Sequence, residues 1–342
     1  MKKIAFLFLF CCELLQPARA QFPLHPDSLF QFIRSQSVHR GQVDWKLVEE
    51  RFHACLAKAL QTRDTMNCFV GILEIMDDVH SQLFLDGQFF GNYPVFDDST
   101  RLRLLPLVNQ SNAETNRVTI AMANRSTAYL RLPSITVGDQ ASIESLAQQI
   151  RDSLNRLLSK KPKGLIIDLR LNGGGNIYPM LSGLGPLLGD GEVGFETDYQ
   201  GQRQRTWEIR GGNFVIGGYQ STHLAAGKPN PGASRLPVAI LIGPATRSSG
   251  TMVGIAFRHR PYTKLIGEAT AAGYTTSNGY FQITPRLMMN LAAGFVADRK
   301  GQLYRKNLEP EIQVNLADDF TNLQMDPKIR RAIDWLQKKY RP

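Results

Sequence analysis

Two apolar segments that end in small residues place the strongest constraint on how this chain folds. Residues 164–176 read GLIIDLRLNGGGN, an apolar run that leads into three consecutive glycines. Residues 237–250 read PVAILIGPATRSSG, a second apolar run that stops at paired serines. Each run predicts a strand, because short apolar runs bounded by turn residues are typical of buried strands. The sequence therefore predicts a glycine loop and a serine turn, each at the end of a core strand.

The elements around these strands predict an α/β fold. Residues 127–135 form a strand candidate, and residues 142–158 form a helix with its apolar side chains on one face. The strand 164–169 follows directly, and strand, helix and strand joined by short connections predict a right-handed βαβ crossover. The other elements expected in this core are the strand 238–242, the helix 250–257, the strand 264–266, further strands within 279–297 and the segment 307–314.

The pattern divides the chain into five parts. Asp44 is expected to cap the first helix of a helical hairpin, and Asp326 and Pro327 are expected to start a last amphipathic helix. No internal repeat and no long Pro- or Ser-rich linker separates independent domains. The predicted parts are a signal peptide over 1–20, an N-terminal helical domain over 21–84, a connecting region of short strands over 85–126, the core over 127–314, and the C-terminal helix within 315–342.

The first twenty residues have the composition of a secretory signal. Lys2 and Lys3 form a basic start, residues 4–15 are almost entirely apolar, and residues 18–20 read ARA, a small-residue cleavage site. The apolar run is too short to span a bilayer. We therefore expect a periplasmic or extracellular protein that begins near Gln21 and has no integral membrane segment after signal removal.

The charge of the chain and its distribution indicate which kinds of molecule it binds. The formal net charge is +10 and becomes +8 once residues 1–20, with three cationic residues and one acidic residue, are removed. The positive charge is spread along the chain, and no basic stripe is interleaved with aromatic residues, so we expect no nucleic-acid partner. The oligomeric state is left open by the sequence.

The cysteines and histidines of the sequence indicate whether the chain forms a disulfide or binds a metal ion. Beyond the signal peptide only Cys55 and Cys68 remain, and two cysteines in an exported chain predict one disulfide, here closing a short loop between adjacent helices. Two buried thiols are the alternative. The six histidines show no HExxH-type spacing, so we expect no metal site and no cofactor.

The glycine and serine turns together supply the parts needed for acyl transfer. A nucleophile at Ser248 or Ser249 would have its hydroxyl lifted out of the sheet. The amides of Gly173 and Gly174, helped by that of Ser249, would bind the developing oxyanion, because glycine lets a backbone approach a ligand closely. On the residues alone, a tight packing turn and a surface loop remain alternatives.

A base for the serine is sought among the histidines. His80 is the best candidate, because it lies past the end of a helix in the polar segment DDVHSQ. The other histidines considered lie in N-terminal connections or on a polar helix face (His25, His39 and His53). Glu268 follows a strand in LIGEAT and is expected to orient the histidine or line the cleft, with an ordinary salt bridge as the alternative.

Four sets of motifs carry a resemblance to a known family. They are VDWKLVEERF; DDVHSQL; GLIIDLRLNGGGN with PMLSGLGPLLGDGEVGF; and TRSSG followed by RPYTKLIGEAT, ADRKGQLY and LEPEI. Together they span roughly residues 42–314. With these motifs the chain resembles the C-terminal processing (tail-specific) serine peptidases, in particular the branch that lacks a PDZ domain and is similar to the tricorn protease core.

The resemblance implies a fold, an activity and roles for individual residues. It implies a Clp-protease/crotonase-like core of stacked ββα units with an N-terminal helical domain. It also implies an exported serine peptidase that acts on proteins or peptides, with Ser248 as nucleophile and Ser249 supplying an oxyanion amide. The lysine base of PDZ-containing members is missing from GEATAAGY at 267–274, so the resemblance places His80 in that role. A non-catalytic protein that binds apolar ligands or peptides on the same scaffold is the alternative function.

Overall fold

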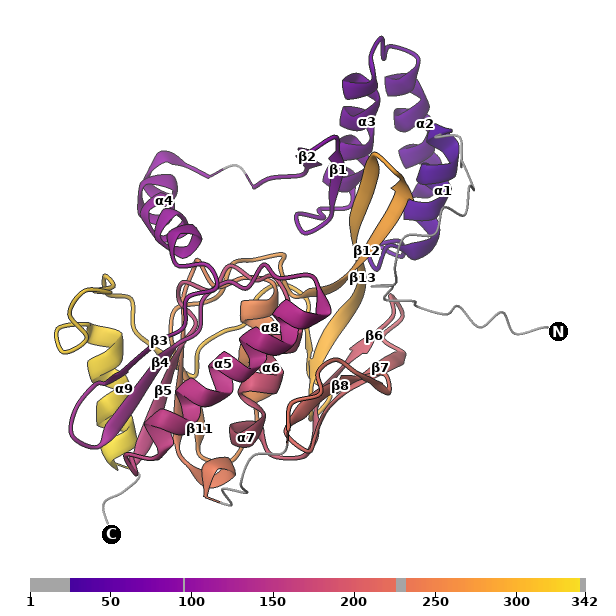
Figure 1. The fold of residues 1–342 in the computed structure, drawn as a ribbon. Coiled ribbons are helices and arrows are strands. Elements are labelled where there is room, and N and C mark those ends of the chain that lie inside the picture. The colour runs from indigo at the N-terminus through magenta and orange to yellow at the C-terminus, as the bar shows by residue number, and fades with distance from the viewer. Residues whose placement is uncertain (1–24, 95, 226–231, 339–342) are drawn as a thin grey trace.

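A computed structural model describes residues 25–94, 96–225 and 232–338 (Figure 1). The signal peptide predicted over 1–20 lies outside the described residues. The described chain forms two β-sheets with helices between and around them, as the α/β prediction requires.

The first sheet contains the predicted βαβ unit. Its strand order is β15-β11-β10-β5-β4-β3, with parallel pairing everywhere except at the β3 edge. The helix α5 (Gln140–Leu158) connects β4 to β5. Because β5 and β10 are parallel neighbours, the glycine loop and the serine turn both follow the carboxyl ends of these strands and leave the sheet on the same side. The strands are β3 (Thr119–Met122), β4 (Thr127–Arg131), β5 (Gly164–Asp168), β10 (Val238–Ile242), β11 (Thr263–Gly267) and β15 (Ile312–Gln313).

The second sheet is antiparallel and extends from the core to the N-terminal helices. Its order is β2-β1-β13-β6-β7-β8-β9, and β12 and β14 also pair with the long strand β13. This sheet brings the segment after the N-terminal helices next to the β12–β13 hairpin. Its strands are β1 (Gln82–Leu85), β2 (Gln88–Gly91), β6 (Gly191–Thr197), β7 (Arg203–Arg210), β8 (Asn213–Ile216), β9 (Tyr219–Gln220), β12 (Thr276–Thr284), β13 (Leu287–Asp298) and β14 (Leu303–Tyr304).

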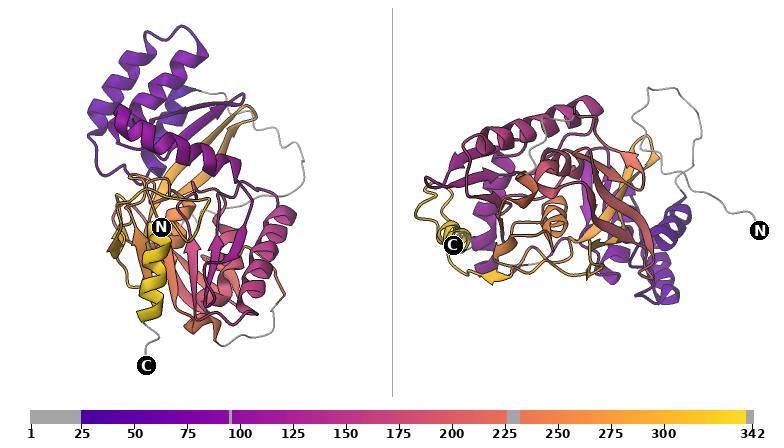
Figure 2. Two further views of the ribbon diagram at one scale, coloured as in Figure 1. Left: turned by 90° about the vertical axis from the view of Figure 1, so that its left-hand side faces the viewer. Right: turned by 90° about the horizontal axis from the view of Figure 1, so that it is seen from below.

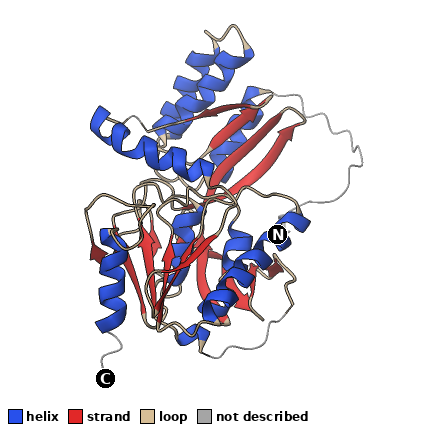
Figure 3. Cartoon of the chain, turned by 60° about the vertical axis from the view of Figure 1, so that its left-hand side comes forward, coloured by secondary structure: helices blue, strands red, loops and turns tan. Residues whose placement is uncertain are grey.

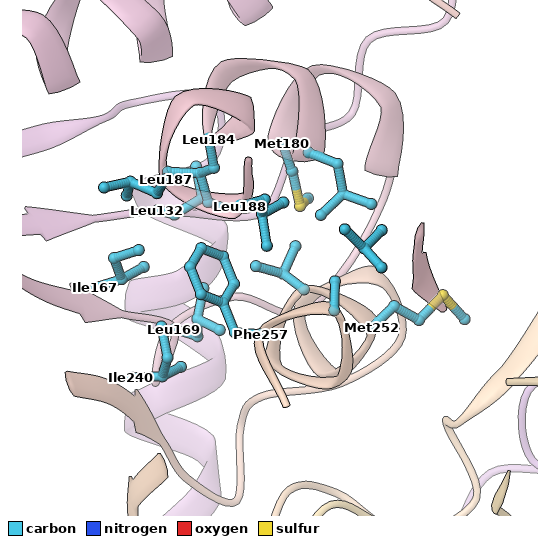
Figure 4. Close-up of a cluster of buried hydrophobic side chains, with 14 of the residues drawn as sticks. Leu132, Ile167, Leu169, Met180, Leu184, Leu187, Leu188, Ile240, Met252 and Phe257 are labelled. Atoms are coloured by element: carbon cyan, nitrogen blue, oxygen red, sulfur yellow. The ribbon is translucent and has the colours of Figure 1, made fainter. Parts of the chain in front are cut away.

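A large apolar core joins the two sheets through short helices. The helix α8 (Ser249–Phe257) packs against β10 of the first sheet and against β6 and β13 of the second, and α6 (Ile177–Gly183) packs on α5 and α8. Figure 4 shows Ile167 of β5 and Phe257 of α8 in this cluster beside Leu184 and Leu187. The helix α7 (Gly185–Leu188) and a 3-10 helix (Ala233–Arg235) complete this layer. The last helix, α9 (Pro327–Lys338), covers the other face of the first sheet (Figure 2).

Three N-terminal helices form a separate apolar cluster above the second sheet. They are α1 (Pro26–Gln36), α2 (Trp45–Leu56) and α3 (Thr62–Ile75), and they pack over the β12–β13 hairpin (Figure 3). Leu287 and Met289 of β13 lie in this cluster. Asp44 accepts a hydrogen bond from the Lys46 N–H and so caps α2. No helix in the described ranges is both long enough and apolar enough to cross a membrane.

Cys55 of α2 and Cys68 of α3 are joined by a disulfide, with Cα atoms 5.7 Å apart. We predict that the double variant Cys55→Ser/Cys68→Ser loses about 3 kcal/mol of unfolding free energy, because a crosslink of this loop length restricts the unfolded chain by about that amount. Urea denaturation monitored by circular dichroism measures the loss. Reduction of the wild type with a thiol should lower stability equally, whereas an unchanged midpoint would show that the bridge does not restrain the unfolded chain.

Residues 85–126 contain a helix where only short strands with loops were expected. The helix α4 (Asp98–Ala113) lies between β2 and β3. Asp97 caps it by accepting hydrogen bonds from the Thr100 N–H and the hydroxyls of Ser99 and Thr100. Only Ser111 is buried, and Pro106 lies inside the helix. Since α4 has no apolar stripe, periodicity does not reveal it.

Candidate active site

Ser248 occupies a strained backbone position at the start of α8. Its φ is 51° and its ψ is −128°, a conformation that costs a non-glycine residue about 1–3 kcal/mol. The turn that follows β10 is held in place because the Arg247 N–H donates to the Asn172 carbonyl at 3.0 Å. Ser248 is partly exposed and lies beyond the carboxyl end of β10. Strain at a serine between a strand and a helix is typical of an exposed nucleophile.

This strain predicts a stability difference between two variants. Ser248→Gly should unfold at a higher temperature than Ser248→Ala, because glycine adopts the positive φ without a Cβ and alanine does not. We expect a gap of about 1 kcal/mol, measured by differential scanning calorimetry. The matched comparison is made at Ser145, on the exposed face of α5. There the Gly variant should unfold at a lower temperature than the Ala variant, because glycine disfavours a helix interior. Equal stability of the two Ser248 variants would contradict the strain.

His80 lies beside Ser248, as the sequence predicts. It is buried in the turn between α3 and β1, and its Nε2 is 2.9 Å from the Ser248 Oγ. Asp78 shapes this turn, because its Oδ1 accepts hydrogen bonds from the His80 N–H at 3.0 Å and the Ser81 N–H at 2.9 Å. His80 lies just before β1 of the second sheet, and Ser248 lies between β10 of the first sheet and α8.

A short chain of hydrogen bonds sets the tautomer of His80. The Thr276 hydroxyl donates to Asn278 Oδ1 at 2.9 Å. Its oxygen then accepts from His80 Nδ1–H at 2.7 Å, so Nε2 carries no proton and accepts from the Ser248 hydroxyl. Asn278 Nδ2 also donates to the His80 carbonyl at 3.1 Å. Sequence reasoning missed Thr276 and Asn278, whose only signal is the polar run TTSN at the start of β12.

The surroundings keep His80 neutral. Its pKa is lowered from 6.5 to about 4, first by burial and also by the positive charge of Arg247 and by His39. The Asp78 carboxylate acts in the opposite direction and raises the pKa. A neutral imidazole can take a proton from serine over the whole physiological pH range.

The predicted oxyanion donors differ in their availability. The Gly173 N–H donates to Ser134 Oγ at 2.8 Å, and the Gly174 N–H donates to Asn172 Oδ1 at 3.0 Å. The Ser249 N–H, at the first position of α8, has no acceptor among the residues that the structure describes. Gly174 has a φ of +107°, and a Cβ there would lie 2.6 Å from the Cβ of Ser248. The glycine loop therefore borders the serine, but only the Ser249 amide is free.

Glu268 does not orient His80. Instead, it forms ion pairs with Arg103 and Lys328, the latter at 2.7 Å. Burial acts to raise the pKa of Glu268, but hydrogen bonds from these two cations outweigh it and lower the pKa. The position after β11 points this carboxylate toward α4 and α9, where it borders a cavity of about 870 Å³ together with Asp318. The salt-bridge alternative is the one that the structure supports.

The site combines a serine hydroxyl, a neutral imidazole and a free helix-start amide, which is a set suited to acyl transfer. Within the described ranges no group of three or more His, Cys, Asp or Glu side chains is placed to hold a metal ion. The model for peptidase family S41 matches residues 126–314, more than half of the chain. The chain belongs to peptidase family S41. The family predicted from the motifs is thereby confirmed.

This S41 family member is also similar to individual proteins. A nisin-resistance protein from Lactococcus lactis subsp. lactis is 29% identical over 215 residues, 63% of this chain and 61% of the relative, so the match spans less than two thirds of that protein. A lipoprotein structure from Streptococcus agalactiae superposes with a TM-score of 0.68 at 22% identity and covers 92% of this chain and 95% of that one.

A more distant structure shares the same fold. The photosystem II D1 C-terminal processing protease superposes with a TM-score of 0.53 at 12% identity, covering 87% of this chain and 95% of that chain. At this identity the likeness concerns the fold alone.

Proposed function

We propose that the S41 chain is an exported serine peptidase that cleaves peptide bonds with Ser248 as nucleophile and His80 as general base. The observation that carries the proposal is the 2.9 Å hydrogen bond between Ser248 Oγ and His80 Nε2, made by a serine on a strained turn. The basic start, apolar run and ARA site of residues 1–20 support export. Proteins or peptides are the proposed substrates, and C-terminal processing is one form that the activity would take.

The reaction follows from the hydrogen bonds of the site. Ser248 Oγ attacks the scissile carbonyl carbon while His80 Nε2 takes the hydroxyl proton, and the carbonyl oxygen becomes an oxyanion. His80 then gives this proton to the leaving amine nitrogen as the C–N bond breaks. Water, deprotonated in turn by His80, hydrolyses the resulting acyl-serine ester and regenerates the free hydroxyl.

Two kinds of group would stabilise the charges that form. The imidazolium keeps its Nδ1–H on the Thr276 oxygen, and the nearby Asp78 carboxylate favours the positive charge. The oxyanion would be held by the Ser249 amide at the positive end of α8. Gly174 would join it when the oxyanion replaces Asn172 Oδ1 as the acceptor of the Gly174 N–H.

The lowered pKa of His80 predicts the acid limb of the pH profile. The free base must be unprotonated, so kcat/KM should stay level from neutral pH down to about pH 5 and fall as pH drops through about 4. Initial rates on a peptide without ionisable side chains, measured across about pH 3 to 8, test this. A midpoint near the ordinary histidine value of 6.5 would show that His80 is not held neutral by burial.

Cleavage of a mixed peptide library by the mature protein tests the proposed function. Mass spectrometry identifies the cut bonds, and a fluorophosphonate probe reports whether Ser248 is reactive. Nisin is included because one relative is named for resistance to it. Cleavage near C-terminal ends would identify a processing peptidase, and internal cleavage an endopeptidase. A folded protein that neither cleaves any peptide nor reacts with the probe would favour the binding-protein alternative.

A further inference from the structure

Arg247 lies in the wall of the candidate active site. It directly precedes Ser248 and is partly exposed. Its Nε is 3.3 Å from the position that a Cβ on Gly173 would occupy. Its Cζ is 5.8 Å from the ring centroid of Tyr274, and that ring meets the His80 imidazole edge-on at 5.2 Å. The guanidinium thus lies between the glycine loop and the aromatic ring that borders the base.

The charge of Arg247 is not compensated by a carboxylate. Among the described residues it forms no ion pair, whereas the buried Arg170 pairs with three aspartates and Arg131 pairs with Glu114. A partly buried cation without an anionic partner is costly, and a bound anion would relieve that cost. The planar guanidinium is suited to two parallel hydrogen bonds with a carboxylate.

We propose that Arg247 binds a carboxylate of the peptide substrate beside the scissile bond and so selects peptides that carry a negative charge there. The carboxylate is either the free C-terminus or an Asp or Glu side chain near the cleaved bond. The inference rests on the proposed function, because it assumes that peptides bind next to Ser248. It adds a specificity determinant that the reaction at Ser248 and His80 does not itself require.

Peptide binding by the Ser248→Ala variant tests the inference without turnover. Three decapeptide pools carry a neutral fluorophore at the N-terminus: one with a free C-terminal carboxylate and no acidic residue, one amidated and without acidic residues, and one amidated with a single Glu. Fluorescence anisotropy gives the Kd of each pool. We expect at least one carboxylate pool to bind about tenfold or more tightly than the neutral pool, since charged hydrogen bonds have roughly that effect.

Variants then assign the preference to the guanidinium. Ser248→Ala/Arg247→Gln should bind all three pools alike, and Arg247→Lys should retain part of the preference because it keeps the charge but loses the planar fork. Ser248→Ala/Arg101→Gln is the matched control, since it removes the same charge from the exposed face of α4 and should keep the preference. Circular dichroism shows whether each variant is folded.

The outcomes separate the two carboxylate sources and the two proposals. Preference for the first pool alone identifies the chain terminus, and preference for the Glu pool alone identifies a side chain. Equal binding of all pools, no binding of any pool, or a preference that survives in Arg247→Gln overturns the inference. If the wild-type protein neither cleaves peptides nor reacts with the fluorophosphonate, the proposed peptidase function is wrong, even where the carboxylate preference is found.

Discussion

Ser248→Ala should lower kcat by at least about ten-thousand-fold, because the attacking oxygen is removed and no neighbouring group takes its place. Ser249 cannot substitute, since its hydroxyl donates to the Gly175 carbonyl at 2.5 Å. The fold should be retained, with a thermal midpoint within a few degrees of the wild type, as the variant removes one partly exposed oxygen. Steady-state hydrolysis of a fluorogenic peptide found in the library measures the effect.

The controls separate loss of the nucleophile from general damage. Ser145→Ala on the exposed face of α5 should match the wild type. Ser249→Ala keeps the backbone amide and loses only the bond to Gly175, so it should show a milder defect. If Ser248→Ala retains more than a few per cent of wild-type activity after purification to homogeneity, Ser248 is not the nucleophile.

His80→Ala should reduce kcat by about a thousand-fold to ten-thousand-fold, since the serine hydroxyl then has no base at 2.9 Å and the leaving amine has no acid. Added imidazole should restore part of the rate, because the substitution leaves a space of matching shape beside Thr276. Activity as a function of imidazole concentration is the measurement.

A second histidine provides the comparison for this result. His53 lies on α2, where its ring packs beside Phe30 and Phe52, so His53→Ala should neither lose activity nor respond to imidazole. A His80→Ala enzyme with near-normal turnover would assign the proton transfer to another group. An inactive variant that imidazole does not rescue, but that Ser248 probes still label at the wild-type rate, would also contradict the base role.

The sequence predicted the main parts of the site because each lies at a strand or helix boundary. The apolar runs before Gly173 and Ser248 identified two strands, and parallel pairing of β5 and β10 brings their ends together. His80 was recognised by its polar setting after a helix. These signals are local in the sequence. The family motifs then predicted a single fold that contains all of these residues.

The remaining parts depend on contacts between residues far apart in the sequence. Thr276 lies 196 residues from His80, and its run of polar residues resembles any exposed strand. The partners of Glu268 come from α4 and α9, so nothing near LIGEAT predicts its ion pairs. Both cases require the tertiary arrangement, which periodicity and local composition do not contain.

The distance along the chain between the proposed base and the proposed nucleophile has a consequence for the timing of biosynthesis. His80 and Ser248 are separated by 168 residues. At about 5–20 residues per second, a ribosome makes Ser248 roughly 8 to 34 s after His80. Throughout that interval the growing chain contains only half of the pair. The proposed peptidase would therefore be unable to cut neighbouring chains, or itself, until most of its length has been made.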